Sequence, residues 1–290
     1  MSCILCNRES FQALYSIEGY EIQTCRECGL TQLNPLPNAE LLREIYISDY
    51  FSKDRKRQGY DDYAVQEEEY ETTFEEELEI LEKFVKGKRV LDIGCGFGYF
   101  LGVALKKGYD AYGIDLSKQA IEIAEKKYPG RVFKGTIDTV PEIQKSRYDI
   151  VFCSHLIEHL PDPVAFAESV ACLLRPGGVC SIVTPNIGSL LSRISGRRWV
   201  SFKVPEHLSY FNFTTIKRLL ETVGLNPIRV ESAHQYYRLP FIAEKIRDLL
   251  HPVSLFIPRI ENMPPFKNRI IRIHNGSLRA IAVKTQSSEA

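Results

Sequence analysis

Hydrophobic positions change their spacing along the chain, and after Gly87 strand-like runs alternate with helix-like runs. The strand-like runs are, in chain order, KRVLDIG, DAYGID, RVFKG, YDIVFCS, GVCSIVT, PIRVES and SLRAIAVKT. Apolar residues between them share helical faces in four groups, which are Phe97, Leu101, Ala104 and Leu105; Ala120, Ile121, Ala124 and Tyr128; Val164, Ala167, Ala171 and Leu174; and the run from Thr214 to Val223. This alternation predicts an α/β fold with a mostly parallel, doubly wound sheet.

An acidic segment, residues 64–86, precedes the sheet pattern. Its apolar residues fall at i, i+4, i+8 and i+11 and are Tyr70, Phe74, Leu78 and Leu81. That spacing forms one apolar stripe along a helix. The glutamates around the stripe predict a helix whose other faces are solvated.

Shifts in composition divide the chain into three parts. Residues 1–38 contain two cysteine pairs, residues 39–86 are expected to form a helical connecting arm, and residues 87–290 carry the sheet pattern. Within the last part, an insertion at about 239–275 is rich in proline and aliphatic residues, with one apolar helical face. We expect a helical lid over the active site, or a lid that lies on a membrane surface and receives a lipid-linked substrate.

The N-terminal cysteines form a CxxC, an 18-residue spacer and a second CxxC, and they are Cys3, Cys6, Cys25 and Cys28. The residues between the pairs alternate around Glu18-Gly19, which predicts a short hairpin. Four thiolates complete a tetrahedral zinc site with no open position, so the pattern predicts a structural zinc ribbon. A redox CxxC is the alternative, but it would sit at a helix start in a βαβ unit, which this segment lacks.

Charge and composition narrow the function classes. The chain has 37 Lys+Arg against 37 Asp+Glu. This balance gives no net positive charge that would attract a nucleic acid. The start of the chain lacks a basic segment followed by an apolar one, and no later run reaches the roughly 18 apolar residues of a spanning helix. We therefore expect a cytoplasmic protein.

The run VLDIGCGFG joins the first strand of the sheet to a helix. Glycines let this turn lie against a ligand, and NAD or FAD would be the usual occupant. Two features argue against a dinucleotide. Counted from Gly94, the sixth position of the motif is Tyr99 rather than a small residue, and Asp92 would repel a pyrophosphate. S-adenosylmethionine carries a sulfonium and an ammonium group without phosphate, so it suits this loop better.

Asp115 lies at the end of the second strand, about twenty positions after the glycine loop. A carboxylate there can accept hydrogen bonds from both ribose hydroxyls of a nucleoside. The alternative is that Asp115 only caps the helix that starts at Ser117. Thr136 and Ile137, after the third strand, fall where an adenine ring would be flanked.

The runs VLDIGCGFG, GIDLS, YDIVFCSHLIEHLPDP and LLRPGGVCSIVTPN together resemble class I S-adenosylmethionine-dependent methyltransferases, from about Lys88 to Asn186. Later segments look like bacterial members near the ubiquinone-biosynthesis enzymes. The cysteine module resembles the zinc-ribbon-bearing branch that includes sugar methyltransferases. The resemblance implies a Rossmann-like, seven-stranded sheet whose last strand is antiparallel. The insertion departs from the pattern, so the resemblance does not name the acceptor.

The resemblance also implies how S-adenosylmethionine is held. The predicted donor-binding residues are Asp92, Gly94, Cys95, Gly96, Gly98, Tyr99, Asp115, Leu116, Thr136, Ile137, Ser154 and His155. Among them, Ser154 and His155 are expected to line the methionine end of the donor.

A competing motif overlaps this region. His155-Leu156-Ile157-Glu158-His159 matches the HxxEH pattern of inverted zinc peptidases, in which both histidines bind zinc from one helix. Leu160-Pro161-Asp162-Pro163 would end such a helix within one turn, which disfavours a peptidase. His159 is then a loop residue that makes a hydrogen bond, or a contact to the acceptor.

The predicted catalytic pair is Glu206-His207, which lies beyond the fifth strand among Trp199, Phe202, Tyr210 and Phe211. Methyl transfer depends on positioning, but an acceptor hydroxyl also needs a base. Imidazole titrates near neutral pH and suits that role. The alternative is a structural histidine in a proline-ordered loop.

These observations predict an enzyme that transfers a methyl group from S-adenosylmethionine to a hydroxyl of a sugar or another small metabolite. Methylation of carbon or nitrogen on a nucleotide-linked sugar or lipid-linked glycan is an alternative. A zinc-ribbon interaction protein that senses S-adenosylmethionine without turnover is another, which the combination of donor residues and a candidate base disfavours. The acceptor and the oligomeric state stay open.

Overall fold

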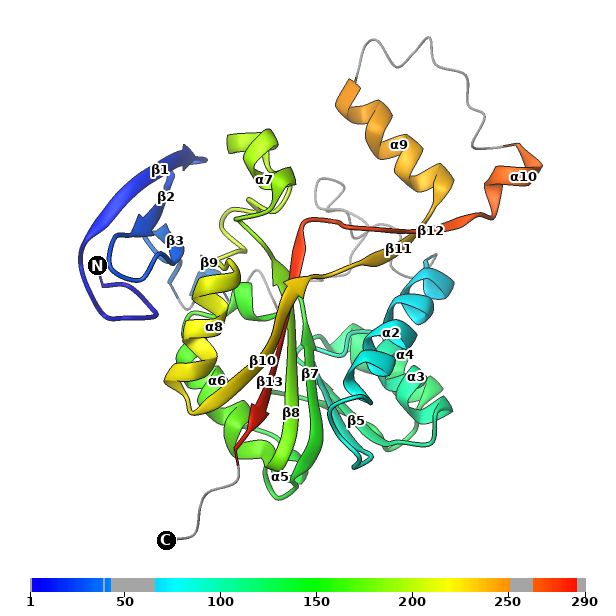
Figure 1. Cartoon of the computed structure of the whole chain (residues 1–290). Helices are drawn as coiled ribbons and strands as arrows, with labels where there is room; N and C mark the ends of the chain where they lie inside the picture. The colour runs from blue at the N-terminus through cyan, green and yellow to red at the C-terminus, as the bar shows by residue number, and fades with distance from the viewer. Residues whose placement is uncertain (1, 39, 43–65, 251–262, 286–290) are drawn as a thin grey trace, which may run out of the picture.

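The computed structural model describes residues 2–38, 40–42, 66–250 and 263–285 (Figure 1). A mixed α/β domain with a central twisted sheet makes up most of it, and a small β module formed by the N-terminal residues lies against one side (Figure 1). Half of the predicted connecting arm, namely residues 39 and 43–65, lies outside the described residues.

The central sheet has the strand order β10-β13-β8-β7-β4-β5-β6. Its strands, in chain order, are β4 (Arg89–Ile93), β5 (Asp110–Asp115), β6 (Val132–Lys134), β7 (Tyr148–Ser154), β8 (Leu174–Pro185), β10 (Leu225–Ser232) and β13 (Ser277–Lys284). β13 runs antiparallel to both of its neighbours, whereas the other neighbouring pairs are parallel. The predicted fold class is confirmed, including the antiparallel last strand.

Helices cover both faces of this sheet (Figure 1). They are α2 (Glu67–Leu81), α3 (Tyr99–Lys106), α4 (Lys118–Lys127), α5 (Pro141–Gln144), α6 (Pro163–Leu173) and α8 (Phe213–Thr222). Successive strand residues point to opposite faces. Val90 accordingly packs in the core cluster formed with α2, α3 and α4, and Leu91 in the cluster formed with α5, α6 and α8. The sheet is therefore doubly wound, and its carboxyl ends stay open for a ligand.

The N-terminal module is a four-stranded antiparallel sheet with the order β1-β2-β3-β9. Its strands are β1 (Phe11–Ile17), β2 (Tyr20–Cys25), β3 (Thr31–Asn34) and β9 (Ser209–Tyr210). The predicted hairpin is confirmed, because β1 and β2 pair around a turn at Glu18 and Gly19 with positive φ angles of 52° and 84°. The fourth strand, β9, comes from the part of the chain that carries the central sheet. The sequence did not predict this pairing.

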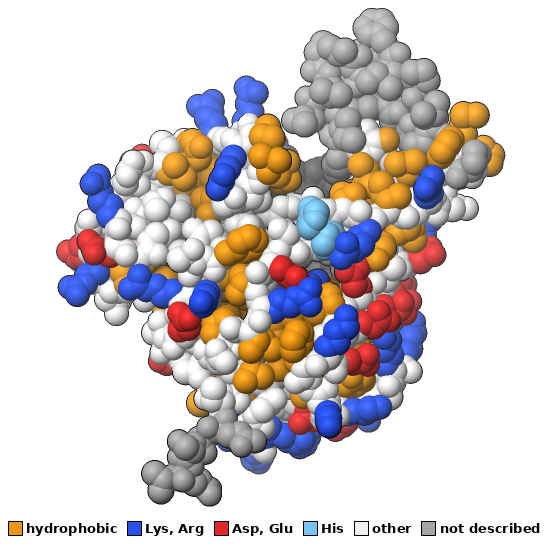
Figure 2. All heavy atoms as spheres, viewed as in Figure 1, with side chains coloured by type: hydrophobic (Ala, Val, Ile, Leu, Met, Phe, Trp, Pro, Cys, Tyr) orange, Lys and Arg blue, Asp and Glu red, His pale blue; other side chains and the backbone are white. Residues whose placement is uncertain are grey.

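Helix α2 is only partly solvated outside its apolar stripe, because Glu67, Glu68, Glu75 and Glu79 are exposed but two other glutamates are buried. Glu69 and Glu77 are each only 3% exposed. Arg238 donates to Glu69 at 2.7 Å, and Arg279 donates to Glu77 at 2.6 Å. Because these arginines follow α2 by about 170 and 200 positions, no local pattern could indicate them. On the face shown in Figure 2, acidic and basic side chains lie next to one another over this region.

The predicted insertion, residues 239–275, begins with a helix, and the strand β11 (Gln235–Arg238) lies directly before it. The insertion contains α9 (Leu239–Leu250), α10 (Pro264–Lys267) and β12 (Ile270–Ile273), and β12 pairs with β11. The Tyr236 backbone N–H donates to Thr73 Oγ1 at 3.0 Å, which holds this ribbon against α2. Residues 251–262 lie outside the described part. Among the described residues, none of the helices combines the length and the apolar character needed to span a bilayer.

Candidate active site

A cavity of about 1240 Å³ opens where the parallel strands of the sheet end. The predicted residues in its lining are Asp92, Gly94, Cys95, Gly96, Asp115, Leu116, Thr136, Ile137, Ser154, His155 and His207. Gly98, Tyr99 and Glu206 are not part of the lining that the described residues form. The structure therefore gathers most of the predicted donor site and one of the two predicted catalytic residues around one space.

The glycine loop turns tightly between β4 and α3. Gly94, Gly96 and Gly98 have φ angles of 74°, 52° and 78°, which side-chain-bearing residues rarely adopt. A Cβ at Gly98 would also lie 3.0 Å from the ring of Tyr128. Tyr99, the large residue at the sixth motif position, is buried, and its ring stacks on Tyr70 of α2 at 5.5 Å. Helix α2 thus packs where a dinucleotide-binding fold places a small residue.

Asp92 lies one residue before the end of β4, and Asp115 ends the adjacent strand β5. Burial and the neighbouring Asp115 raise the pKa of Asp92 well above its usual value. Burial also raises the pKa of Asp115, although the backbone N–H groups that it accepts oppose this. A cationic or hydroxyl-bearing ligand would compensate these two carboxyl groups, which is the chemistry that a nucleoside with an ammonium group supplies.

Asp115 has a role distinct from capping the next helix. Its Oδ2 accepts the Gly96 N–H at 2.9 Å, and its Oδ1 accepts the Ser117 N–H at 2.8 Å. Ser117 is itself the N-cap of α4, because its Oγ accepts the Ala120 N–H at 3.2 Å. The carboxylate therefore ties the glycine loop to the end of β5 and still faces the cavity.

The HxxEH segment follows β7 and contains only a three-residue 3-10 helix, η1 (Ile157–His159). His155 precedes η1 with a φ of 53°. The pattern therefore lacks the long helix that displays both histidines in a zinc peptidase, as Pro161 predicts. Glu158 is 1% exposed and accepts the Thr184 hydroxyl at 2.9 Å, while its other oxygen lies 3.3 Å from His155 Nδ1.

His207 lies in the cavity wall but is only 4% exposed. Burial and the neighbouring His159 lower the pKa of His207 well below its usual value. The two imidazole rings meet edge to face at 4.6 Å, and His159 Nδ1 bonds the backbone carbonyl of Glu206 at 3.1 Å. Of the predicted aromatic wall, Phe202 lines the cavity, whereas Trp199 and Tyr210 pack behind it.

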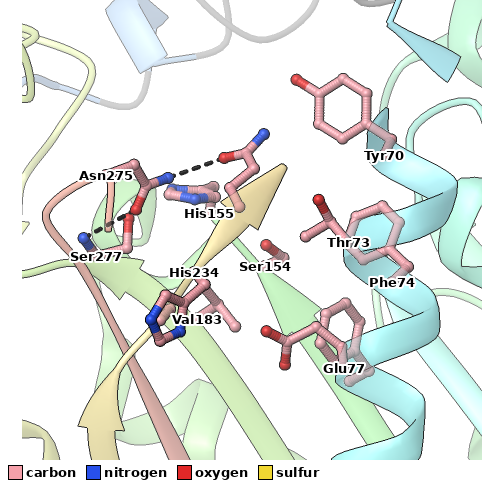
Figure 3. A pocket seen from close by; sticks show the side chains of 13 residues that line it. Tyr70, Thr73, Phe74, Glu77, Ser154, His155, Val183, His234, Asn275 and Ser277 are labelled. Carbon is pink, nitrogen blue, oxygen red and sulfur yellow. Dashed lines mark hydrogen bonds between the residues drawn. The ribbon is translucent and has the colours of Figure 1, made fainter. Parts of the chain in front are cut away.

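Several residues that line the cavity could not be assigned to the site from the sequence. Helix α2 contributes Tyr70, the hairpin turn contributes Glu18, β11 contributes Gln235 and Tyr237, and the insertion contributes Asn275. A smaller cavity of about 40 Å³ joins the same region between β7, α2 and the insertion (Figure 3). In it, the Asn275 amide donates to Gln235 at 2.8 Å.

The four N-terminal cysteines converge, with their sulfur atoms within 4.8 Å of one another. Cys3 and Cys28 sulfurs are 3.4 Å apart, and those of Cys6 and Cys25 are 3.6 Å apart, without disulfides. Tetrahedral zinc with Zn–S bonds of about 2.3 Å needs sulfurs about 3.8 Å apart, so the donor set suits that metal. Burial raises the pKa of Cys3 and Cys28, which disfavours thiolates unless a cation binds them.

Comparisons with known proteins agree with this architecture. A family model described as "Methyltransferase domain" matches residues 65–230. The ubiquinone biosynthesis O-methyltransferase of Vibrio parahaemolyticus is 30% identical over 159 residues, which cover 51% of this chain and 68% of that protein. For the Vibrio cholerae enzyme of the same name the identity is 29%, and the chain spans 65% of its length.

A solved structure described as the plantazolicin methyltransferase BpumL in complex with SAH has a TM-score of 0.57 and 18% identity, covering 84% of this chain and 94% of that one. At that identity the likeness concerns the fold. The domain match, the relatives and the strand order lead to one conclusion: the chain belongs to the methyltransferase-domain family, with the Rossmann-like fold of class I S-adenosylmethionine-dependent methyltransferases.

Proposed function

We propose that this protein transfers a methyl group from S-adenosylmethionine to a hydroxyl of a small, ring-shaped acceptor. The observation that carries the proposal is the pair of carboxyl groups beside the glycine loop, which are the buried Asp92 and the partly buried Asp115. Lys203 is the one lysine or arginine in the cavity lining formed by the described residues, so the loop offers no cation to a pyrophosphate. This electrostatic pattern suits a cationic nucleoside and disfavours NAD or FAD.

Different residues would bind different parts of the donor. Asp92 would accept from the ammonium group, Asp115 from the ribose hydroxyls, and Thr136 and Ile137 would flank the adenine. Ser154, at the end of β7, would lie near the methionine end. When bound, S-adenosylmethionine supplies an electrophilic methyl group on a sulfonium.

The acceptor would enter beside η1 and the loop that carries Phe202 and Lys203. The sequence pattern predicts that His207, aided by Glu206, removes the proton, and this role stays a prediction. Because burial holds His207 uncharged, we propose that it accepts a hydrogen bond from the acceptor. An uncharged imidazole in the wall can orient a hydroxyl without carrying the proton away.

Two acceptor classes fit a ring-shaped substrate. A sugar is the acceptor that the resemblance of the cysteine module suggests. A phenolic ring is the second candidate, because the relatives are named as ubiquinone biosynthesis O-methyltransferases. Aromatic side chains in the wall, such as Tyr237 and Phe241, can stack on either ring.

Purified protein and S-adenosylmethionine test the proposal, with release of S-adenosylhomocysteine as the readout. We expect release with methyl α-D-glucopyranoside, 3,4-dihydroxybenzoate or a low-mass cell extract, and none without acceptor. The methylated product, identified by mass spectrometry, decides between the sugar, the phenol and a carbon or nitrogen acceptor. Saturable binding of S-adenosylhomocysteine without release under any of these conditions would instead support a sensing protein.

We also propose that the four cysteines hold one structural zinc. The thiol pairs of Cys3 with Cys28 and Cys6 with Cys25 join the two knuckles crosswise. Cys3, Cys25 and Cys28 belong to the same buried cluster as Ile216 of α8. The metal would therefore stabilise the contact between the module and the larger domain as well as the knuckles themselves.

A further inference from the structure

His155 is held in a conformation that a histidine rarely adopts. Its φ of 53° places the backbone in the left-handed region, directly after the buried strand β7. The His155 N–H donates to the Val183 carbonyl of β8 at 2.8 Å, so the sheet itself holds this geometry. Backbone strain that the surrounding structure enforces is typical of functional sites.

The strained position places the side chain at the cavity. His155 lines both the large and the small cavity, and its side chain is 42% exposed. Figure 3 shows His155 and Ser154 at the end of β7, across the small cavity from Tyr70 and Thr73 of α2. The ring is therefore accessible to a ligand, unlike that of His207, which is 4% exposed as a residue.

A buried carboxylate orients the His155 ring. Glu158 Oε1 lies 3.3 Å from His155 Nδ1, and Glu158 Oε2 accepts the Thr184 hydroxyl at 2.9 Å. Burial alone would raise the pKa of Glu158, but the adjacent His155 imidazole, with Nδ1 at 3.3 Å, helps to lower it to about 2. The carboxylate is therefore ionised at neutral pH. It favours the tautomer with the proton on Nδ1 and leaves Nε2 as a proton acceptor, the logic of a carboxylate–histidine pair in hydrolases.

We propose that His155 is the general base of the methyl transfer and that Glu158 is its positioning residue. The proposal rests on the proposed function and deepens it. As the acceptor oxygen bonds to the methyl carbon, the carbon–sulfur bond breaks, and its electron pair stays on sulfur and neutralises the sulfonium. The acceptor's hydroxyl proton moves to His155 Nε2, and the resulting imidazolium is paired with Glu158. Exposure of the side chain lets this proton leave to solvent.

The other titratable groups around His155 are already engaged or lie deeper. Glu77 is paired with Arg279, and the His234 ring stacks on His274 at 3.7 Å. On the side of η1, burial lowers the pKa of His159. Tyr70 faces His155 from α2. Among the described residues that surround it, Glu158 is thus the carboxylate placed to stabilise a protonated His155.

A test that needs no acceptor uses NMR of protein with ¹⁵N-labelled histidine, with His155 signals assigned by their loss in His155→Gln. We expect the neutral ring to carry its proton on Nδ1. In Glu158→Ala the preference should weaken or reverse, and thermal unfolding would confirm that the variant is folded. A neutral wild-type ring protonated on Nε2 would overturn the proposal.

Turnover provides the second test, with methyl α-D-glucopyranoside, 3,4-dihydroxybenzoate and the low-mass extract as probes. His155→Gln should lower kcat by about 10²- to 10⁴-fold and remove the acid limb of its pH profile, with S-adenosylhomocysteine affinity within about threefold of wild type. Glu158→Gln should lower kcat by about tenfold or more and shift that limb to lower pH, because the protonated ring loses its counter-charge.

His234→Gln is the matched control, since His234 lines the same small cavity but stacks on another histidine. It should keep kcat within about threefold. A His155→Gln variant with wild-type kcat and pH profile would overturn the base assignment while leaving the proposed function intact. Absence of turnover by wild-type protein with every probe would overturn both.

Discussion

Replacing Asp115 by alanine tests whether this carboxylate binds the donor's ribose. The change removes the acceptor of the Gly96 and Ser117 N–H groups and a carboxylate from the cavity lining. Helix α4 keeps its own cap at Ser117, so the helix should still form. The main loss is therefore expected in donor affinity rather than in folding.

The magnitude follows from the bonds that disappear. Hydrogen bonds to a charged group contribute about 1.5–3 kcal/mol each, and they are not additive. Loss of two ribose bonds should cost about 2–4 kcal/mol, which is about a 30- to 1000-fold rise in Kd. Asp115→Asn keeps one acceptor oxygen for the Gly96 N–H, so its Kd should rise only about tenfold. The two variants should therefore weaken binding to different degrees.

Calorimetric titration with S-adenosylhomocysteine measures the Kd of the wild type and of each Asp115 variant, and thermal unfolding shows whether each variant is folded. Asp110→Ala is the matched control, because Asp110 begins the strand that Asp115 ends and bonds the exposed Arg131 instead. It should bind as wild type does. A folded Asp115→Ala variant with wild-type affinity would refute the ribose role and leave Asp115 as a local tie for the glycine loop.

Three further predictions concern the remaining groups. Asp92 has a raised pKa in the free protein, and an ammonium ligand would lower that pKa. The affinity for S-adenosylhomocysteine should therefore rise with pH. Calorimetric titrations at several pH values should show no such rise for Asp92→Asn. His207→Asn should raise the acceptor KM and leave kcat within about tenfold, whereas a fall of 10²-fold or more would make His207 the base. Metal analysis should find one zinc per chain, and near-zero zinc in folded protein, or unchanged zinc in Cys3→Ser/Cys25→Ser, would contradict the ribbon.

The sheet could be predicted because its strands carry their own signal. β4, β7 and β8 are buried on both faces, so they appear as continuous apolar runs between turn residues. The glycine loop likewise depends on residues adjacent in sequence, since three positive φ angles need three glycines within five positions. Features that depend on local spacing were accessible without coordinates.

Pairing between distant segments was not accessible. The β9 strand is two residues long and joins the N-terminal sheet through Thr31 and Gln32 of β3. The Leu33 N–H also donates to the Leu208 carbonyl at 2.9 Å. No periodicity can indicate so short a strand. Because Leu208 follows His207, the cysteine module lies one residue from the acceptor wall, a link that the division into separate parts conceals.

The HxxEH segment does not form a zinc-peptidase site, but its His155 and Glu158 can still have another function. Pro161 disfavours the helix of a zinc peptidase, and η1 is indeed a single turn. A zinc peptidase needs both histidines on one helical face, and the absence of that face says nothing about the role of His155 alone. A positive φ at His155 turns the ring away from a helical arrangement and toward Glu158, three positions later. Sequence spacing placed the carboxylate and the imidazole near each other, but only the backbone conformation decides that they meet at the cavity.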